Sequence, residues 1–250
     1  MMKREVLNYN GIPYLKYSPT TLQVKGSILF LHGIGERGTD ITLVEHNEIP
    51  KQCLDPNFEV PYIVIAPQLP TSYPGWWENF TNPLTALMKT MPGHKHITGL
   101  SLGGMRPTVV LVENPGVYDS ASTVCGTNDV PVMGASSVSI LAAELARIPT
   151  IHYYDPADTT IQSGGGYASI KSMCTQYAGK ADITLVEINN PSNHHAIWPI
   201  AYQTGNFWKW LDSKVSPPVL DPVVKMDYDP VNMNIVYTTQ SGKTIIIKVN

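Results

Sequence analysis

The 250-residue chain has little charge and no long apolar run, and each shortage excludes a class of protein. Charged residues make up 15% of the chain, and 17 Lys and Arg against 20 Asp and Glu give a formal net charge of −3. Nucleic acids and anionic membrane surfaces are both bound by clustered basic residues, so we expect neither partner. No window approaches the ~20 consecutive apolar residues of a membrane span.

Cysteine is also scarce, and the first residues lack an apolar segment. The three cysteines, Cys53, Cys125 and Cys174, are widely spaced, which predicts buried thiols and not a disulfide framework. The opening residues MMKREVLNYNGIPY carry charge without the continuous apolar stretch of a signal peptide. We therefore expect a cytoplasmic protein.

The hydrophobic residues that are present, 43% of the chain, suffice for one sizeable core. Apolar segments rich in β-branched residues alternate with helical patterns, which indicates a mainly parallel sheet covered by helices. Near-continuous hydrophobicity predicts strands buried on both faces. The six expected strands are 26–33, 62–69, 95–101, 119–126, 149–155 and 182–189, and the expected helices are 82–91, 102–113, 138–148, 166–179 and 197–214.

The two ends of the chain each carry a hairpin pattern. At the start, residues 4–10 and 12–18 predict an antiparallel hairpin. Prolines in SPPVLDP, residues 216–222, mark a break, and two β-rich segments beyond it flank Ser241-Gly242. We expect a main domain over residues 1–215 and a short C-terminal β-hairpin extension over 216–250.

Ser101 lies between two glycines in Gly99-Leu-Ser-Leu-Gly103, where a predicted strand ends. The pattern G-x-S-x-G alone matches by chance about once in ten chains of this length. Its strand-turn-helix context is that of a nucleophile elbow, in which small neighbours permit a turn that projects the serine hydroxyl above the sheet. Ser101 is therefore the candidate nucleophile. Pro107 should kink or shift the following helix, because it removes a helical hydrogen bond.

A serine hydroxyl needs a base, and an imidazole needs a carboxylate that fixes its tautomer. Both should come from loops at the carboxyl ends of the strands. The loop after the last predicted strand offers His195 and its rival His194, and the loop before it offers Asp155 and Asp158. We favour Asp158, because Asp155 precedes a proline and fits a turn initiator.

A Gly-rich loop after the strand 26–33 could bind a developing oxyanion. In His32-Gly-Ile-Gly35 the small residues let the backbone N–H of Ile34 face the serine, and the N–H of Leu102 would be the second donor. We expect His32 to be structural, and Glu36 and Arg37 to hold the loop through an ion pair.

Two further residue patterns bear on ligands. Trp76 and Trp77 follow another predicted strand at the same edge and are candidates for an aromatic wall of the substrate site, with core packing as the alternative. The histidine pairs His94-x-His96 and His194-His195 lack Cys, Asp or Glu partners at convincing spacing, so we expect no metal.

Together these segments resemble the α/β-hydrolase superfamily over about residues 25–214. The segments are LHGIGERGTD, VIAPQLPTSYPGWWENF, ITGLSLGGM, STVCGTND, IPTIHYYDPADTTI and HHAIWPIAY, and they look most like the branch of predicted peptidases, feruloyl- and acetyl-xylan-type esterases and polyhydroxybutyrate-depolymerase-like enzymes. In that branch His-x-x-Trp contains the catalytic base, which favours His195 with Trp198, and the acid falls on Asp158.

The resemblance implies an α/β-hydrolase fold, with a mostly parallel central sheet flanked by helices. It also implies a carboxylic-ester hydrolase that works through an acyl-enzyme without metal or organic cofactor. The expected substrate is a small-molecule or polysaccharide-linked ester. A peptidase or acyltransferase with the same residues, or a non-catalytic binding protein, is the alternative.

Overall fold

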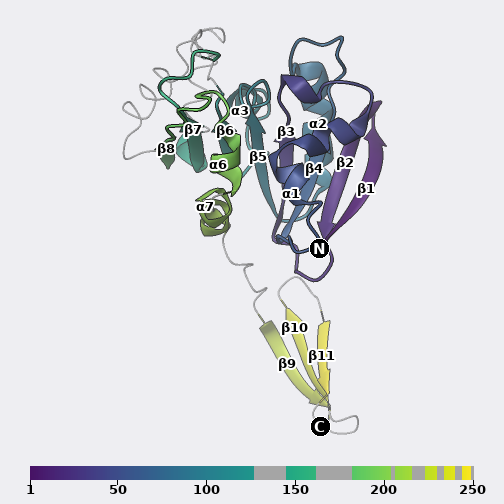
Figure 1. Cartoon of the computed structure of the whole chain (residues 1–250). Helices are drawn as coiled ribbons and strands as arrows, with labels where there is room; N and C mark the ends of the chain where they lie inside the picture. The colour runs from purple at the N-terminus through teal and green to yellow at the C-terminus, as the bar shows by residue number, and fades with distance from the viewer. Residues whose placement is uncertain are drawn as a thin grey trace. The chain divides into compact units, whose positions relative to one another are not determined.

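The structure is a computed structural model that describes residues 1–126, 145–161, 182–203 and 206–215, and three strands between 223 and 248 (Figure 1). The chain divides into two compact units, Met1–Val215 and Ser216–Asn250. Among the described residues, no helix has both the length and the apolar character needed to cross a membrane.

An eight-stranded sheet in the order β1-β2-β4-β3-β5-β6-β7-β8 organises the first unit. Strands β4, β3, β5, β6, β7 and β8 are parallel, and β1 and β2 add an antiparallel edge. The six predicted parallel strands and the leading hairpin are therefore confirmed. The bounds are β1 Met2–Tyr9, β2 Ile12–Pro19, β3 Gly26–Leu31, β4 Tyr62–Pro67, β5 His94–Leu100, β6 Ser120–Val124, β7 Thr150–Tyr154 and β8 Ile183–Glu187.

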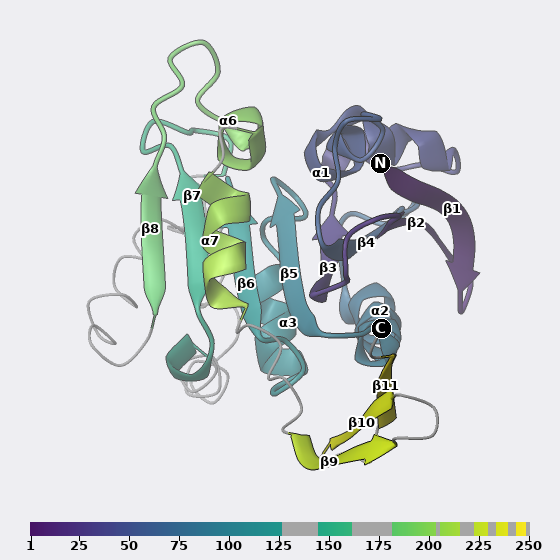
Figure 2. The same ribbon diagram turned by 90° about the horizontal axis from the view of Figure 1, so that it is seen from below.

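Helices cover both faces of this sheet (Figure 2). Alternate strand residues point to opposite faces, and accordingly Ile28 packs in one apolar cluster with α1, α6 and α7, while Leu29 packs in the other with α2 and α3. The α-helices are α1 Glu48–Gln52, α2 Glu78–Thr90, α3 Pro107–Glu113, α6 Trp198–Gln203 and α7 Asn206–Lys214, and the 3₁₀ helices are η1 Ile34–Glu36 and η2 Ile41–His46.

The helix predictions need correction at several boundaries. The helix after Ser101 begins only at Pro107, at the first helical position, where its missing N–H removes no bond. The predicted helix 197–214 is two helices, and the predicted helix 82–91 begins earlier, at Glu78. The candidates 138–148, apart from its last four residues, and 166–179 lie outside the described residues.

The second unit contains a three-stranded antiparallel sheet in the order β11-β10-β9. Its strands are β9 Val223–Asp229, β10 Asn234–Thr239 and β11 Thr244–Lys248. The expected hairpin is correct for β10 and β11 but incomplete, because β9 pairs with the other side of β10.

Candidate active site

Ser101 follows the end of β5 in the left-handed backbone region that non-glycine residues seldom adopt. Its φ is +51°, and its N–H donates to the carbonyl of Val124 at 3.0 Å. A Cβ placed on Gly99 would lie 2.2 Å from the carbonyl oxygen of Gly103, and one on Gly103 would lie 2.0 Å from that of Leu31. Both flanking positions therefore require glycine, because main chains meet there without room for a side chain.

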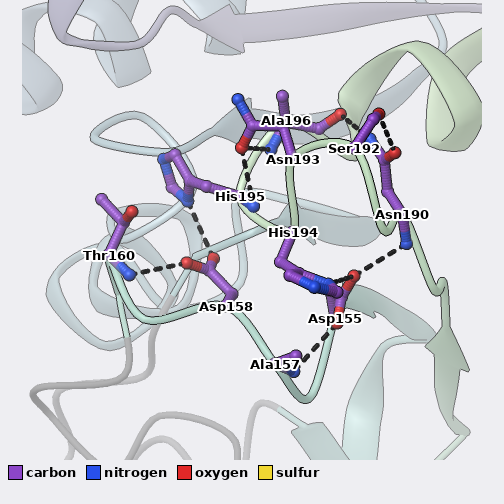
Figure 3. Close-up of polar contacts among 10 residues, drawn as sticks. All are labelled: Asp155, Ala157, Asp158, Thr160, Asn190, Ser192, Asn193, His194, His195 and Ala196. Carbon is purple, nitrogen blue, oxygen red and sulfur yellow. Dashed lines mark hydrogen bonds and ion pairs between the residues drawn. The ribbon is translucent and has the colours of Figure 1, made fainter.

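The side chains of Ser101, His195 and Asp158 form one chain of hydrogen bonds. Ser101 Oγ lies 2.8 Å from His195 Nε2. His195 Nδ1 in turn lies 2.8 Å from Asp158 Oδ2, as Figure 3 shows for these two residues. Asp158 Oδ1 accepts a further bond from the Thr160 N–H at 2.8 Å. Because a carboxylate only accepts, His195 donates through Nδ1, and its Nε2 is left to accept the proton of the serine hydroxyl.

His195 is held in a loop between β8 and α6. Asn193 Oδ1 accepts from the His195 N–H at 3.1 Å and from the Ala196 N–H at 3.2 Å. The Trp198 ring at the start of α6 packs against the imidazole in a T-shaped arrangement, with ring centroids 5.6 Å apart and planes at 83°. Hydrogen bonds within the loop and a ring from α6 thus both restrain His195.

The rival residues form a pair of their own. His194 Nδ1 lies 2.9 Å from Asp155 Oδ2 (Figure 3). Of the two histidines and the two aspartates that the sequence left as alternatives, the structure brings His195 and Asp158 to Ser101.

The loop after β3 lies against the serine. A Cβ placed on Gly33 would be 3.7 Å from Ser101 Cβ. Ile34 follows Gly33, and Leu102 follows the serine; within the described part of the chain, no backbone carbonyl accepts from the N–H of Leu102. Ile34 and Leu102 thus directly follow two residues, Gly33 and Ser101, that lie close to each other in space.

His32 supports this loop from the interior. It donates from Nδ1 to the carbonyl of Gly33 at 2.6 Å, and its Nε2 accepts from the Leu69 N–H at 3.0 Å. Burial lowers the pKa of His32 to about 4, so the ring is neutral and serves as a structural connection at ordinary pH.

No family model and no curated protein matches the chain. Among solved structures, a thermostable esterase is 22% identical with a TM-score of 0.62, and the match covers 85% of this chain but only 62% of that one. The chain has the α/β-hydrolase fold.

Two other solved structures match over nearly their whole length. A ferulic acid esterase is 12% identical, and an S-formylglutathione hydrolase from Staphylococcus aureus is 13% identical, each with a TM-score of 0.57 over 86% of this chain. The matches cover 98% and 97% of those proteins. In this α/β-hydrolase fold, Ser101 follows β5, Asp158 follows β7 and His195 follows β8, at one edge of the sheet.

Glu36 and Arg37 do not form the predicted ion pair. In the described structure Glu36 accepts from the side-chain amide of Asn47, and burial raises the pKa of its carboxyl. Arg37 donates instead to the carbonyls of Ile34 at 3.2 Å and Tyr73 at 2.8 Å. The guanidinium therefore holds the loop of this α/β-hydrolase fold through its backbone.

Trp76 and Trp77 lie in different environments. Trp76 is 2% exposed, and its indole N–H donates to the carbonyl of His32 at 3.0 Å, so it packs inside. Trp77 is 50% exposed. A Cβ placed on Gly75 would be 3.9 Å from the Trp77 ring and 3.8 Å from Leu102 Cδ1, so this ring lies near the residue after the serine.

The remaining candidate groups have structural partners. Cys53 and Cys125 are buried free thiols whose pKa burial raises, and Cys174 lies outside the described residues. His94 and His96 each bond to Ser120 Oγ at 2.7 Å. Within the described ranges no group of three or more His, Cys, Asp or Glu side chains could hold a metal.

Sequence reasoning missed the two asparagines that brace the histidine loop. Besides Asn193, Asn190 donates from Nδ2 to the carbonyl of Ala196 at 2.9 Å. Their signal was present in NPSNHH, because asparagine commonly hydrogen-bonds to backbone groups a few residues along in a turn.

Proposed function

We propose that the chain is a serine hydrolase that cleaves carboxylic esters. One observation carries the proposal: the hydrogen-bonded chain from Ser101 Oγ through His195 to Asp158, with both links at 2.8 Å. The names of the similar structures, among them a thermostable esterase and a ferulic acid esterase, also support it. Residues 1–215 would be the catalytic domain, and 216–250 a separate extension.

In the proposed reaction Ser101 Oγ attacks the ester carbonyl while its proton passes to His195 Nε2. The backbone N–H groups of Ile34 and Leu102 would stabilise the oxyanion, with roughly 2.7–4 kcal/mol lost on removal of one such donor in a studied protease. His195 then protonates the leaving alcohol, and an acyl-serine ester remains. Water, deprotonated by His195, attacks this ester and releases the acid and the free serine.

Asp158 would stabilise the imidazolium that forms in each half of the reaction, without taking its proton. The steps need proton transfer and one covalent serine ester, so the proposal includes no metal and no organic cofactor.

The proposed substrates are small-molecule esters or esters attached to a polysaccharide. Near the serine, Ile34 is 58% exposed and Trp77 is 50% exposed, so both can contact an apolar or aryl group of the substrate. Trp76 is too deeply buried to share that role directly.

The test compares hydrolysis of nitrophenyl esters of increasing acyl length by the wild type and by Ser101→Ala. We expect kcat to fall by about 10³-fold or more in Ser101→Ala and in His195→Ala. Ser72→Ala is the matched control, because Ser72 is exposed. Full activity in Ser101→Ala would refute the mechanism, and a wild type inactive on every ester and amide would favour a binding protein.

A further inference from the structure

Two aspartate–histidine pairs join the same two loops. In one, Asp158 binds the ring of His195, at 2.8 Å; in the other, Asp155 binds the ring of His194, at 2.9 Å (Figure 3). The histidines are neighbours in the chain, and the aspartates are three residues apart. The first pair reaches Ser101 and belongs to the proposed catalytic machinery, whereas the second has no part in the proposed mechanism.

The carboxylate of Asp155 is buried and fully engaged in hydrogen bonds. Its side chain is 1% exposed and accepts three hydrogen bonds, from the Asn190 N–H at 2.8 Å, from His194 Nδ1 at 2.9 Å and from the Ala157 N–H at 2.9 Å. Two of these donors belong to the histidine loop and one to the loop of Asp158. The carboxylate therefore binds both loops at once.

The histidine loop needs such an anchor. It runs from the end of β8 at Glu187 to the start of α6 at Trp198 and contains no regular helix or strand. Its internal bonds shape the loop but do not fix it to the residues after β7, to which the His195–Asp158 bond is the other side-chain connection described above. A backbone bond from the Ile188 N–H to the carbonyl of Tyr154 at 2.8 Å holds its first residue, far from His195 along the chain.

We propose that Asp155 and His194 are positioning residues, which place His195 Nε2 within hydrogen-bond distance of Ser101 Oγ. This inference rests on the proposed function for its kinetic consequences. Because residues 194 and 195 share a peptide unit, holding the first ring restricts the backbone that carries the second. Errors of about 1 Å in such a placement can cost about 100-fold in rate.

The kinetic test uses His194→Ala, Asp155→Ala and the conservative variant His194→Asn. The amide nitrogen of asparagine lies close to the position of the imidazole Nδ1, so His194→Asn keeps the donor to Asp155 while losing the rest of the ring. We expect both alanine variants to lower kcat by about 10- to 100-fold with KM nearly unchanged, and His194→Asn to recover most of the loss.

Asp119→Ala is the matched control, because it removes a carboxylate that accepts a backbone N–H from Lys95 at 2.8 Å, outside the two loops. If His194→Ala or Asp155→Ala lowers the melting temperature yet leaves kcat within about twofold of wild type, the pair is merely structural and the inference is overturned.

A second measurement separates this inference from the proposed function. The proton on His195 Nδ1, shared with Asp158, should give a low-field NMR signal that persists in His194→Asn and is lost through exchange with water in Asp155→Ala and His194→Ala. An unchanged signal in the alanine variants overturns the inference. If the wild type hydrolyses no ester, the proposed function fails, and this signal still decides whether the pair positions His195.

Discussion

Acidification should destabilise the protein through histidines that are buried in their neutral form. The rings of His32 and His152 are 0% and 1% exposed, and burial lowers the pKa of both from 6.5 to about 4. His96 lies in the same sheet, and burial lowers its pKa well below 6.5. The folded protein therefore resists protonation of groups that the unfolded chain protonates readily.

The sign and size of the effect follow from linkage. Well above pH 6.5 these histidines are neutral in both the folded and the unfolded state, and their full contribution to stability is present. Between pH 6.5 and about 4 the histidines of the unfolded state bind more protons than those of the folded state, and the free energy of unfolding falls. At about 1.4 kcal/mol per pKa unit, His32 and His152 each remove about 3 kcal/mol by pH 4. A typical domain has roughly 5–15 kcal/mol in total, so the loss is large.

Buried carboxyls oppose this loss. Burial raises the pKa of Glu36 and Glu48, so these groups take up protons earlier in the folded state and favour it as the pH falls through their raised pKa values. The pH dependence of the free energy of unfolding of the wild type therefore contains contributions of both signs. A variant that removes one histidine isolates its share.

His152→Gln is the most direct perturbation, since the His152 ring bonds through Nδ1 to the hydroxyl of Thr123 at 2.8 Å. The free energy of unfolding, measured by urea titration between about pH 7 and pH 4.5, should fall less steeply with falling pH in this variant than in the wild type, by up to about 1.4 kcal/mol per pH unit. His46→Gln is the matched control, because its ring is exposed. Equal slopes for wild type and His152→Gln would refute the reasoning, whatever the absolute stabilities.

Three further substitutions have defined outcomes. Gly33→Ala should lower kcat for nitrophenyl esters, because its Cβ would lie 3.0 Å from the side chain of Leu100, next to the serine in the chain. Gly35→Ala is the control and should affect kcat less, because its Cβ would have no atom within 4 Å. Equal losses of kcat in the two variants would contradict this packing argument. Trp76→Phe should lower the free energy of unfolding by about 1–3 kcal/mol, because it leaves the buried carbonyl of His32 without its donor. Trp77→Phe changes an exposed ring, so it should leave urea unfolding unchanged and raise KM for aryl esters. Gly103→Ala should lower the melting temperature or prevent folding, since its Cβ would approach a backbone carbonyl to 2.0 Å, and a normal melting temperature would contradict this.

The parts that sequence predicts well are those in which one local pattern has one physical cause. Buried parallel strands must be apolar on both faces, so segments such as 26–33 are recognisable in isolation. The glycines around Ser101 are required by contacts of the main chain, which makes the turn visible as a motif.

The parts that sequence predicts poorly depend on which partner lies across space. Neighbouring side chains do not face each other, so the adjacency of Glu36 and Arg37 carried no information about pairing. Likewise, which of Trp76 and Trp77 turns inward is decided by the carbonyl of His32, far along the chain.

Strand β9 escaped prediction for a similar reason. Its residues Val223–Asp229 mix apolar with charged side chains next to prolines, and the segment becomes a strand through its pairing with β10.

The direct meeting of main chains around Ser101 limits where this protein can diversify. Positions 99 and 103 tolerate no side chain, so neither mutation in nature nor a designed library can alter selectivity there without losing the turn itself. Exposed residues near the serine, such as Ile34 and Trp77, should tolerate substitution instead. A library directed at those two positions should therefore yield folded variants with new preferences, at little risk to the scaffold.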